Sequence, residues 1–450
     1  METRMRSASI NAIGQLTGDE TIEQKRKSAI RGAVLSEFID MFDIYLPVII
    51  LAPIQSFFLP RHLSGGHQAI LESLVFITTL LGRPLGALLF GRIADKVGRR
   101  AASIASVSGF AVTTFLIALI PGYESIGIAS YWILVGLRFI DGIFLGGGYT
   151  GAVPLAIEYS KREQRGVVGG LILAGFPAAY VAINLIAMIM FELFPVGGPQ
   201  SAYAQWGWRI PFGLGALMAA ILAFYYVRKV TESEVWAGKS MRAAGATTSN
   251  RLFKGHELRN LVQVLLMMTG FWLTQNVVGL FVPTGVLLKT LHLTAFQMTA
   301  TLMISYTVLC FGYVGAGVLG QRIGRRTMLS LIGGLTCTIG ALLLYLLIGA
   351  AGRSLPIVVL LVCGLAIVVS SAWAVIVTYI NERFATGVRA TGFGVGYSLS
   401  VIVPSFYAFY MSWLGSVMPL QYAPVALLCI GGVIACFGAL LGPETKDVEL

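Results

Sequence analysis

The chain has 450 residues, of which 56% are hydrophobic and only 12% are charged, and its formal net charge is +11. Soluble domains contain about 25% charged residues, so this composition excludes a soluble enzyme, a disordered chain and a disulfide-stabilised secreted module. Apolar stretches of about 20–28 residues lie between short charged clusters, and each is long enough to cross a hydrocarbon core of about 30 Å as a helix. The sequence therefore predicts a polytopic, all-α integral membrane protein.

Twelve membrane-spanning helices are expected, six on each side of a long polar segment. The first six, which form an N-terminal bundle over 32–228, are expected at 32–58, 69–90, 101–121, 131–154, 167–191 and 209–228. The second six, which form a C-terminal bundle over 260–441, are expected at 260–288, 297–319, 327–350, 355–381, 390–414 and 421–441. The cytoplasmic N-terminal tail, the linker between the bundles and the cytoplasmic C-terminal tail are expected at 1–31, 229–259 and 442–450. Because the linker is rich in Gly, Ser, Thr and Ala and has mixed charge, we expect it to be flexible.

The distribution of basic residues predicts the orientation in the membrane. An even number of spans places both termini on one side, and all but six of the 32 Lys and Arg residues lie in segments that face that side. The six exceptions are Arg61, Arg83, Arg138, Arg209, Lys289 and Arg353. Since cytoplasmic loops have the excess of Lys and Arg, both termini are expected in the cytoplasm and the chain in the cell inner (plasma) membrane. The basic clusters are short and lie between apolar runs, which indicates a lipid bilayer and not nucleic acid as the partner.

Two motifs recur at nearly the same interval along the chain. The segments Gly91–Arg100 (GRIADKVGRR) and Gly317–Arg326 (GVLGQRIGRR) begin 226 residues apart. A Glu followed seven residues later by an Arg occurs at 158–165 and again, 224 residues on, at 382–389. Both motifs lie in expected inner loops. We therefore interpret the chain as a tandem duplication of six-helix units, an architecture typical of transporters with a binding site between the halves at mid-membrane.

At these motifs the sequence resembles the major facilitator superfamily. The loop pattern G-x-x-x-D-[KR]-x-G-R-R of that superfamily is matched by Gly91, Asp95, Lys96, Gly98, Arg99 and Arg100. Further segments resemble its metabolite:proton symporter branch, near the sugar porters: GRPLGALLFG (82–91), GLRFIDGIFLGGGYTGA (136–152), IEYSKREQRG (157–166), WGWRIPF (206–212), NERFATGVRATG (381–392) and GPET (442–445). The resemblance implies two six-helix bundles that work by alternating access and are coupled to the proton gradient. Members of that branch transport small organic acids, amino-acid-like osmolytes and related metabolites.

Two positions depart from the family pattern. The paired glycines of the fourth span are usually followed by Glu in the family, whereas Gly148 follows Gly146 and Gly147 here. In the second-half copy of the loop motif, Gln321 stands where the first half has Asp95, which weakens the expectation of symmetric gating.

Ionisable residues inside the expected spans are the main functional candidates, because each costs several kcal/mol in hydrocarbon unless it has a partner or a wet cavity. The first span has Asp40 and Asp43, the second has Arg83, and the fourth has Arg138 and Asp141. At a rise of about 1.5 Å per residue, Arg83 matches the two aspartates of the first span in depth.

Asp43 is the expected proton carrier, and Asp40 and Asp141 are further proton-coupling candidates. A conformational change that alters the contact between a desolvated carboxylate and an arginine moves a proton. By resemblance, Arg138 matches the family's arginine on the fourth span, which pairs with an acid on the first span. The alternative is a static pair of Arg138 with Asp141, one turn apart, and a similarly locked pair of Asp40 with Arg83.

Candidate substrate-binding residues combine charge with aromatic and amide groups. Arg83 has a planar fork that suits carboxylates, so it is either an anion clamp or the counter-ion of Asp40. The substrate-binding candidates are Arg83, Arg138, Tyr45, Gln275, Asn276 and Trp373. For any single aromatic or amide residue, ordinary packing is the alternative. Glu37, near the inner edge of the first span, is expected to be hydrated.

The repeated loop motifs predict a cytoplasmic gate. Its candidate residues are Gly91, Asp95, Arg99, Glu158, Arg165, Arg325, Glu382 and Arg389. Gly91 allows close backbone approach, Asp95 can cap an adjacent helix, and the Glu and Arg residues can form a salt-bridge lattice that holds the inner side closed. Anchoring by positive charge is the alternative, but it does not explain the repeated Glu and Arg spacing.

The sequence has no signal for catalysis or for a bound cofactor. The ATP-binding pattern G-x-x-x-x-G-K-[ST] does not occur, the four His residues are not grouped, and the five Cys residues form no disulfide or metal pattern. We therefore expect a monomeric secondary transporter, not an enzyme, without cofactor or metal. Its expected function is proton-coupled uptake of a small organic anion such as a carboxylate metabolite. The alternatives are transport of a zwitterionic osmolyte or a sugar, proton-driven export, and a metabolite-sensing membrane receptor.

Overall fold

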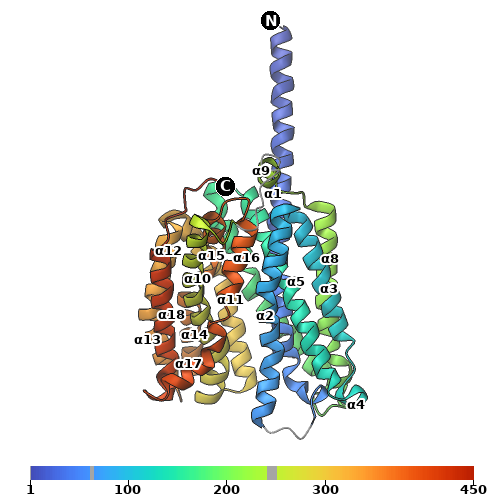
Figure 1. Cartoon of the computed structure of the whole chain (residues 1–450). Helices are drawn as coiled ribbons and strands as arrows, with labels where there is room; N and C mark the ends of the chain where they lie inside the picture. The colour runs from blue at the N-terminus through green and yellow to red at the C-terminus, as the bar shows by residue number, and fades with distance from the viewer. Residues whose placement is uncertain (1, 61–64, 241–250) are drawn as a thin grey trace.

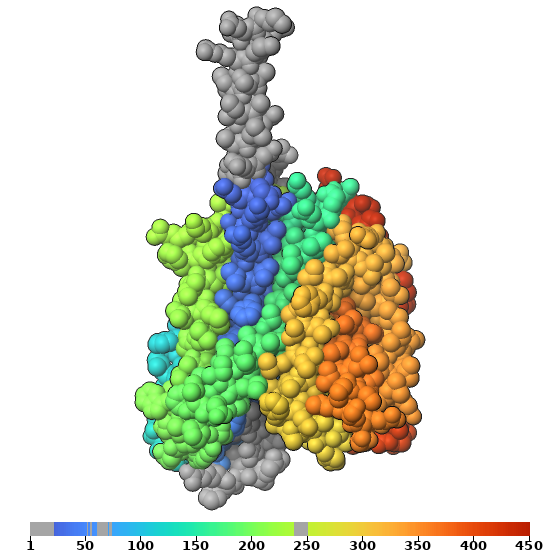
Figure 2. Space-filling model, turned by 180° about the vertical axis from the view of Figure 1, so that it is seen from behind, coloured from blue at the N-terminus to red at the C-terminus, as the bar shows by residue number. Residues whose placement is uncertain are grey.

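The computed structural model describes residues 2–60, 65–240 and 251–450. Within these ranges the regular structure is helical, and no strand is present. Two helical bundles stand side by side, one from the first half of the chain and one from the second (Figure 1). Seen from behind, the green segment of the first half lies against the yellow segment of the second half where the bundles meet (Figure 2).

The N-terminal bundle contains six membrane-crossing segments. Its long helices are α1 (Glu2–Ile50), α2 (Gly65–Lys96), α3 (Arg99–Ala118), α5 (Ala129–Tyr159), α6 (Arg165–Leu173) with its continuation α7 (Gly175–Leu193), and α8 (Arg209–Lys229). Shorter helical turns lie between them, namely η1 (Ala52–Phe57), α4 (Tyr123–Ile126), η2 (Arg162–Gln164) and η3 (Tyr203–Gly207).

The C-terminal bundle follows the short linker helix α9 (Glu234–Ser240) and also contains six crossing segments. They are α10 (Gly255–Asn276) with η5 (Val277–Thr290), α11 (Ala295–Ile323), α12 (Arg325–Leu335) with η6 (Thr336–Gly340) and α13 (Ala341–Ile348), α14 (Leu355–Ser370) with α15 (Trp373–Arg383), α16 (Arg389–Leu399) with η7 (Pro404–Phe406) and α17 (Tyr407–Leu414), and η8 (Leu420–Tyr422) with α18 (Ala423–Leu440).

Length and composition of these helices agree with a membrane protein. In the described part of the chain, 11 helices are long and apolar enough to cross a membrane. α1 is the twelfth crossing segment, although Glu37, Asp40 and Asp43 interrupt its apolar run. Large apolar side chains such as Phe311 and Leu360 are exposed on the outside of the bundles, where lipid would cover them. The prediction of an all-α membrane fold with twelve helices in two bundles is confirmed.

Both chain termini lie on the same side of the bundles, which we call the terminal face (Figure 1). α1 extends far beyond the bundle on this side, so the segment expected to be an N-terminal tail, 1–31, is helical from Glu2 onward. The first proline of the chain is Pro47, and no earlier residue removes a backbone donor from the helix.

Glycines bring α2 and α5 into backbone contact. A Cβ atom on Gly86 would overlap the backbone of α5, and one on Gly142 would overlap the carbonyl group of Thr79 on α2. Larger residues do not fit at such a crossing, so the small residues of the fourth span pack against the second span. This close crossing fixes the helices that hold Arg83 and Arg138.

The segment expected to be a flexible linker, 229–259, is ordered in its first part. α9 lies in this first part, and 241–250 lies outside the described residues. The carboxylate of Glu232 accepts hydrogen bonds from the backbone N–H groups of Arg99, at 2.8 Å, and Arg100, at 3.1 Å. Because the first N–H groups of a helix have no partner within that helix, this carboxylate anchors the linker on the start of α3. Composition indicates flexibility, but it does not reveal a partner so distant in the sequence.

Candidate functional site

A cavity lined by residues of both bundles lies between them, at the kind of interface where small-molecule sites occur. The helices that line it are α1, α2, α6 and α7 of the first half and α10, η5, α11, α15 and α16 of the second. Five of the substrate-binding candidates are on its wall, namely Tyr45, Arg83, Gln275, Asn276 and Trp373. The sixth candidate, Arg138, is not.

Arg83 and Asp40 form a buried ion pair at the cavity wall. Nη2 of Arg83 lies 3.1 Å from Oδ2 of Asp40, and the guanidinium lies over the ring of Tyr149, 4.9 Å from its centroid. Nε of Arg83 and Oδ1 of Asp40 have no hydrogen-bond partner among the described residues. In this conformation Arg83 is therefore paired with Asp40, one of the two alternatives for this residue, and the pair keeps one unused donor and one unused acceptor.

A second acid–arginine cluster is sealed inside the N-terminal bundle. Nη1 of Arg138 lies 2.9 Å from Oδ2 of Asp43 and 2.8 Å from Oδ2 of Asp141. Thr114 donates a hydrogen bond to Asp43 at 2.7 Å, and Thr113 donates one to Asp141 at 2.8 Å. All three charged residues are at most 1% exposed. The cluster thus contains two carboxyl groups for one arginine.

The expectation that Arg138 lines the substrate site is corrected by this geometry. Its guanidinium is turned toward α1 and α2, where Nε donates to Thr79 at 3.0 Å, in addition to its bonds with Asp43 and Asp141. Position along a helix gives depth in the membrane, whereas the direction of the side chain depends on how the helix is rotated against its neighbours. The sequence alone does not give that rotation.

Glu37, expected to be hydrated at the inner edge of its span, is instead buried and lines the cavity. It is 5% exposed, and its Oε1 atom has no hydrogen-bond partner among the described residues. α7 covers it, because Gly175 begins that helix so close to α1 that a Cβ there would lie 3.3 Å from the Cβ of Glu37. Since α1 continues as a helix beyond the bundle, Glu37 does not lie at a helix end.

Aromatic residues outside the candidate set complete the wall in the second half. Trp272 and Tyr397 line the cavity next to Trp373, with ring centroids 4.5 Å apart for the two tryptophans and 5.7 Å apart for Trp373 and Tyr397. Tyr313 lines it as well. In the sequence these residues occur in apolar runs, where a wall position and a packed position have the same pattern.

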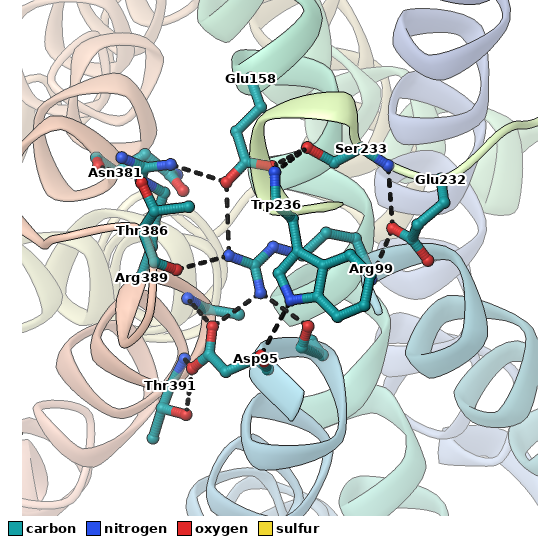
Figure 3. Close-up of polar contacts among 12 residues, drawn as sticks. Asp95, Arg99, Glu158, Glu232, Ser233, Trp236, Asn381, Thr386, Arg389 and Thr391 are labelled. Carbon is teal, nitrogen blue, oxygen red and sulfur yellow. Dashed lines mark hydrogen bonds and ion pairs between the residues drawn. The ribbon is translucent and has the colours of Figure 1, made fainter. Parts of the chain in front are cut away.

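Next to the terminal face, Asp95 joins the two bundles (Figure 3). Its carboxylate accepts hydrogen bonds from the backbone N–H groups of Ala390, at 3.2 Å, and Thr391, at 3.0 Å, and from the hydroxyl group of Thr391, at 2.6 Å. It therefore caps the start of α16. Gly91, one turn earlier on α2, lies against the backbone of Thr391, and a Cβ there would be 2.7 Å from its Cα.

Arg99 and Glu158 extend this contact between the bundles (Figure 3). Nη1 of Arg99 lies 2.7 Å from Asp95, and its Nη2 donates to the carbonyl oxygen of Thr386 at 2.8 Å and lies 3.3 Å from Glu158. Nη1 of Arg389, from the other bundle, lies 2.6 Å from the same oxygen of Glu158. These gate candidates of the first half and Arg389 therefore form one network across the interface.

The second-half copy of the gate is looser. Oε1 of Gln321 accepts hydrogen bonds from the backbone N–H of Gly166 at 2.9 Å and from Arg325 at 2.8 Å. Arg325 and Arg165 lie 3.4 and 3.8 Å from Oε1 of Glu382. A neutral amide replaces the carboxylate of the first half, and the ion pair across the interface is longer. The two copies of the gate motif therefore differ in their contacts.

Two segments that the sequence analysis did not assign to the gate hold it in place. The first is the linker strap, Glu232–Trp236, at the top of Figure 3. Besides the contact of Glu232 with α3, Ser233 donates to Glu158 at 2.5 Å, and Nε1 of Trp236 donates to the carbonyl oxygen of Asp95 at 2.9 Å.

The second is the tail strap, Glu444–Val448, in the segment expected to be the cytoplasmic C-terminal tail. Glu444 accepts hydrogen bonds from the backbone N–H groups of Arg325, at 2.6 Å, and Arg326, at 3.1 Å, at the start of α12. Thr445 donates to Glu382 at 2.7 Å. Each half of the molecule therefore has a strap that caps one helix and bonds the Glu of its gate.

Taken together, these groups form a cavity that can hold a small molecule and a network that closes the molecule on one side. The cavity lies between the bundles, and the gate network separates it from the terminal face. Within the described residues, no group of three or more His, Cys, Asp or Glu side chains is placed to hold a metal ion.

Comparison with known proteins agrees with this geometry. Residues 33–408 match the sequence profile of the Major Facilitator Superfamily. The alpha-ketoglutarate permease of Escherichia coli (strain K12) is 28% identical over 409 residues, which are 88% of each chain. The citrate-proton symporter of Klebsiella pneumoniae is 29% identical over 382 residues, 84% of this chain and 83% of that one.

Two further similarities extend over nearly the whole chain. A glycine betaine/proline/ectoine/pipecolic acid transporter of Dickeya dadantii (strain 3937) is 25% identical over 437 residues, 94% of this chain and 84% of that one. The solved structure of the proton:xylose symporter XylE bound to 6-bromo-6-deoxy-D-glucose superposes with a TM-score of 0.77 and 18% identity, covering 95% of this chain and 98% of that chain. The latter similarity shows the fold.

Proposed function

The chain belongs to the major facilitator superfamily, and from that premise we propose that it is a proton-coupled symporter that takes up a small organic anion such as a carboxylate metabolite. It is a transporter and not an enzyme. The observation that carries the proposal is the presence of two buried acid–arginine clusters in the first half, one at the cavity and one sealed behind it. Buried charges are expensive, and their usual role in membrane spans is to bind ions or protons.

Arg83 is proposed as the group that binds the carboxylate of the substrate. It lines the cavity, it retains an unpartnered Nε, and its guanidinium can bind a carboxylate through two parallel hydrogen bonds. The relatives named for alpha-ketoglutarate and citrate transport support an anionic substrate. The relative named for betaine and proline transport supports a zwitterion, which also carries a carboxylate.

The cluster of Arg138, Asp43 and Asp141 is proposed as the proton site. With both carboxylates ionised it has an excess negative charge in a dry environment, and one proton neutralises that charge. Binding of a proton weakens the hold of the acids on Arg138 and so allows α1 to move relative to α5. Movement of α1 also moves Asp40 and therefore changes its contact with Arg83 in the cavity.

The terminal face is proposed to be cytoplasmic, with the chain in the inner membrane. The excess of Lys and Arg on that side supports this orientation. The gate network is then an inner gate, and the conformation described here is closed toward the cytoplasm. Uptake requires this gate to open after substrate and proton have bound from the outside.

Reconstitution into proteoliposomes tests the proposal directly. Radiolabelled alpha-ketoglutarate and citrate are offered with and without an imposed inward proton gradient. We expect accumulation above the external concentration when the gradient is present, and only equilibration when it is absent. Accumulation that ignores the gradient would contradict proton coupling. Binding without accumulation would support a metabolite-sensing receptor, and an outward-directed flux would support an exporter.

A further inference from the structure

Glu37 is a buried carboxyl group that neither the gate nor the proposed proton site uses. Its side chain lines the central cavity, and Oε1 has no hydrogen-bond partner among the described residues. Arg83, the cationic residue of the cavity wall, forms its ion pair with Asp40 and not with Glu37. A carboxylate without a partner in such a place is costly, so its counterpart is expected to arrive with a ligand or as a proton.

Across the cavity, the second half supplies aromatic surface. Trp272, Trp373 and Tyr397 line the same space, and their ring centroids lie within 4.5 to 5.7 Å of one another. Both indole N–H groups are engaged inside the protein, with the carbonyl oxygen of Tyr397 at 2.9 Å and with Gln275 at 3.1 Å. The tryptophans therefore have ring surface, and no free donor, to offer to a ligand.

These two walls suit a positively charged group. Aromatic faces attract ammonium groups through the quadrupole of the ring, most strongly when the cation is desolvated, and a carboxylate adds full charge complementarity. A neutral apolar group would bury the rings but would leave Glu37 unpaired. A hydroxyl group could bond Glu37 but would bring no counter-charge for it.

Arg83 supplies the opposite charge in the same cavity. Its Nε is unpartnered, while Oε1 of Glu37 is an unpartnered acceptor. The cavity wall therefore offers an unused cationic donor and an unused acid oxygen, in addition to Oδ1 of Asp40 and the hydroxyl group of Tyr313, which have no partner among the described residues either. A ligand that has a carboxylate at one end and an ammonium group at the other would satisfy both.

We propose that Glu37, with Trp272, Trp373 and Tyr397, forms a cation-accepting subsite, and that the substrate is a zwitterion whose ammonium group binds there while its carboxylate binds Arg83. This inference rests on the proposed function: it keeps the proton coupling and the carboxylate that Arg83 binds, and it selects a zwitterion in place of a simple anion as the substrate. It assigns Glu37 to substrate binding and leaves the proton to the cluster around Arg138.

Matched ligand pairs test the subsite. Trimethylammonio-butyrate is compared with the isostere in which carbon replaces nitrogen, and gamma-aminobutyrate is compared with pentanoate. Each pair has the same carboxylate and nearly the same shape, so it isolates the positive charge. Equilibrium binding to the purified full-length protein is measured for all four compounds.

For the wild-type protein we expect at least one zwitterion to bind about tenfold or more tightly than its isostere. In Glu37→Gln the preference is expected to fall to within about twofold, because the amide keeps the size of the side chain but not its charge. Trp373→Leu retains Glu37. It is expected to reduce the preference for trimethylammonio-butyrate over its isostere more than the preference for gamma-aminobutyrate over pentanoate. Glu192→Gln on the exposed end of α7 is the matched control and is expected to keep the wild-type preference.

The outcomes separate the subsite from the proposed function. Equal binding of isosteres and zwitterions by the wild type, or a preference that Glu37→Gln leaves unchanged, overturns the subsite, and so does failure of both zwitterions to bind. If gradient-driven uptake of simple carboxylates persists in that case, the proposed function stands without it. If no compound accumulates but the zwitterion preference is present and depends on Glu37, the subsite stands and the transport proposal fails.

Discussion

Nη1 of Arg138 bonds two carboxylates at once, and this single atom defines the chemistry of the sealed cluster. If Asp43 carries the proton, Asp43→Asn removes the titrating group but retains its size and the hydrogen bond with Thr114. We expect gradient-driven accumulation in proteoliposomes to vanish. Exchange of substrate across the membrane needs no net proton movement and is expected to persist.

Asp40→Asn is the comparison for that experiment, because Asp40 lies one turn away and pairs with Arg83 at the cavity. If Asp40→Asn abolishes accumulation and Asp43→Asn does not, then Asp40 with Arg83 is the coupling pair. Should both variants still accumulate substrate against its gradient, neither aspartate of α1 is the carrier, and Asp141 becomes the remaining candidate.

Removal of Arg138 has a predictable effect on stability. Arg138→Ala leaves Asp43 and Asp141 buried without their cation, and breaking such a pair costs about 3–5 kcal/mol. We expect a clearly lower thermal unfolding temperature in detergent and loss of both accumulation and exchange. The triple variant Arg138→Ala, Asp43→Asn, Asp141→Asn is expected to recover most of the stability, because no uncompensated charge remains. A triple variant as unstable as the single one would mean that packing, and not charge, dominates.

Single residues also show what sequence can and cannot predict about the site. Depth places Arg83 level with both Asp40 and Asp43, since the rise is about 1.5 Å per residue, but it does not select Asp40 as the partner. The same reasoning gives the wrong environment for Glu37, which is expected to be hydrated but is buried. Its burial depends on how closely Gly175 lets α7 approach α1. The position of Arg138 away from the cavity depends on how α5 is rotated, and depth in the membrane does not specify that rotation.

Among the helices, the start of α16 and the start of α6 are capped unequally. Asp95→Asn weakens the stronger cap, since an amide accepts hydrogen bonds from Ala390 and Thr391 less well and loses the ion pair with Arg99. We expect slower net transport and a more open terminal face. The measurement is thiol labelling of a cysteine introduced at Leu80 on the cavity wall, in a background without native cysteines. Wild-type labelling together with wild-type transport would mean that Asp95 only anchors the loop.

Gln321→Asp is the converse change at the weaker cap. It places a carboxylate beside Arg325 and the backbone N–H of Gly166, at the positive end of α6. A charge at such a helix start is worth about 0.3–1 kcal/mol, so the population closed at the terminal face should rise by up to about fivefold. We expect slower labelling at the same cavity position and a lower transport rate. Labelling faster than in the wild type would contradict the assignment of this helix start to the gate.

The straps show why some helix contacts escape sequence analysis. Thr-Glu-Ser at 231–233 and Pro-Glu-Thr at 443–445 are 212 residues apart, an interval close to that of the loop motifs. The second belongs to the family-like segment GPET (442–445), whereas the first has no recognisable motif, because a three-residue match is too short to stand out. Their role depends on the free N–H groups at the starts of α3 and α12, which become partners only in the folded structure.

At the scale of the whole molecule, the twelve-helix arrangement follows from features that sequence reports well. Hydropathy gives the spans, and the repeated loop motifs give two similar halves. The positions at which helices break do not follow from hydropathy or from the repeated motifs. The expected span 390–414 is interrupted between α16 and α17, and the seventh span continues from α10 into the π-helix η5. Such breaks depend on packing around the cavity. The sequence also leaves open which side of the molecule is closed.

Each half ends with its own strap, which caps a helix of that half, so the chain should tolerate a cut at the right place. Two fragments divided within 241–250 both retain a strap, and we expect them to assemble when they are co-produced and to transport substrate. Division directly after Lys229 removes the linker strap from the first fragment, so α3 loses its cap and Glu158 loses Ser233. That pair of fragments is expected to assemble with several-fold lower yield, as measured by co-purification of one tagged fragment with the other. Equal recovery from both cuts would mean that the straps act as connectors and not as integral parts of the halves.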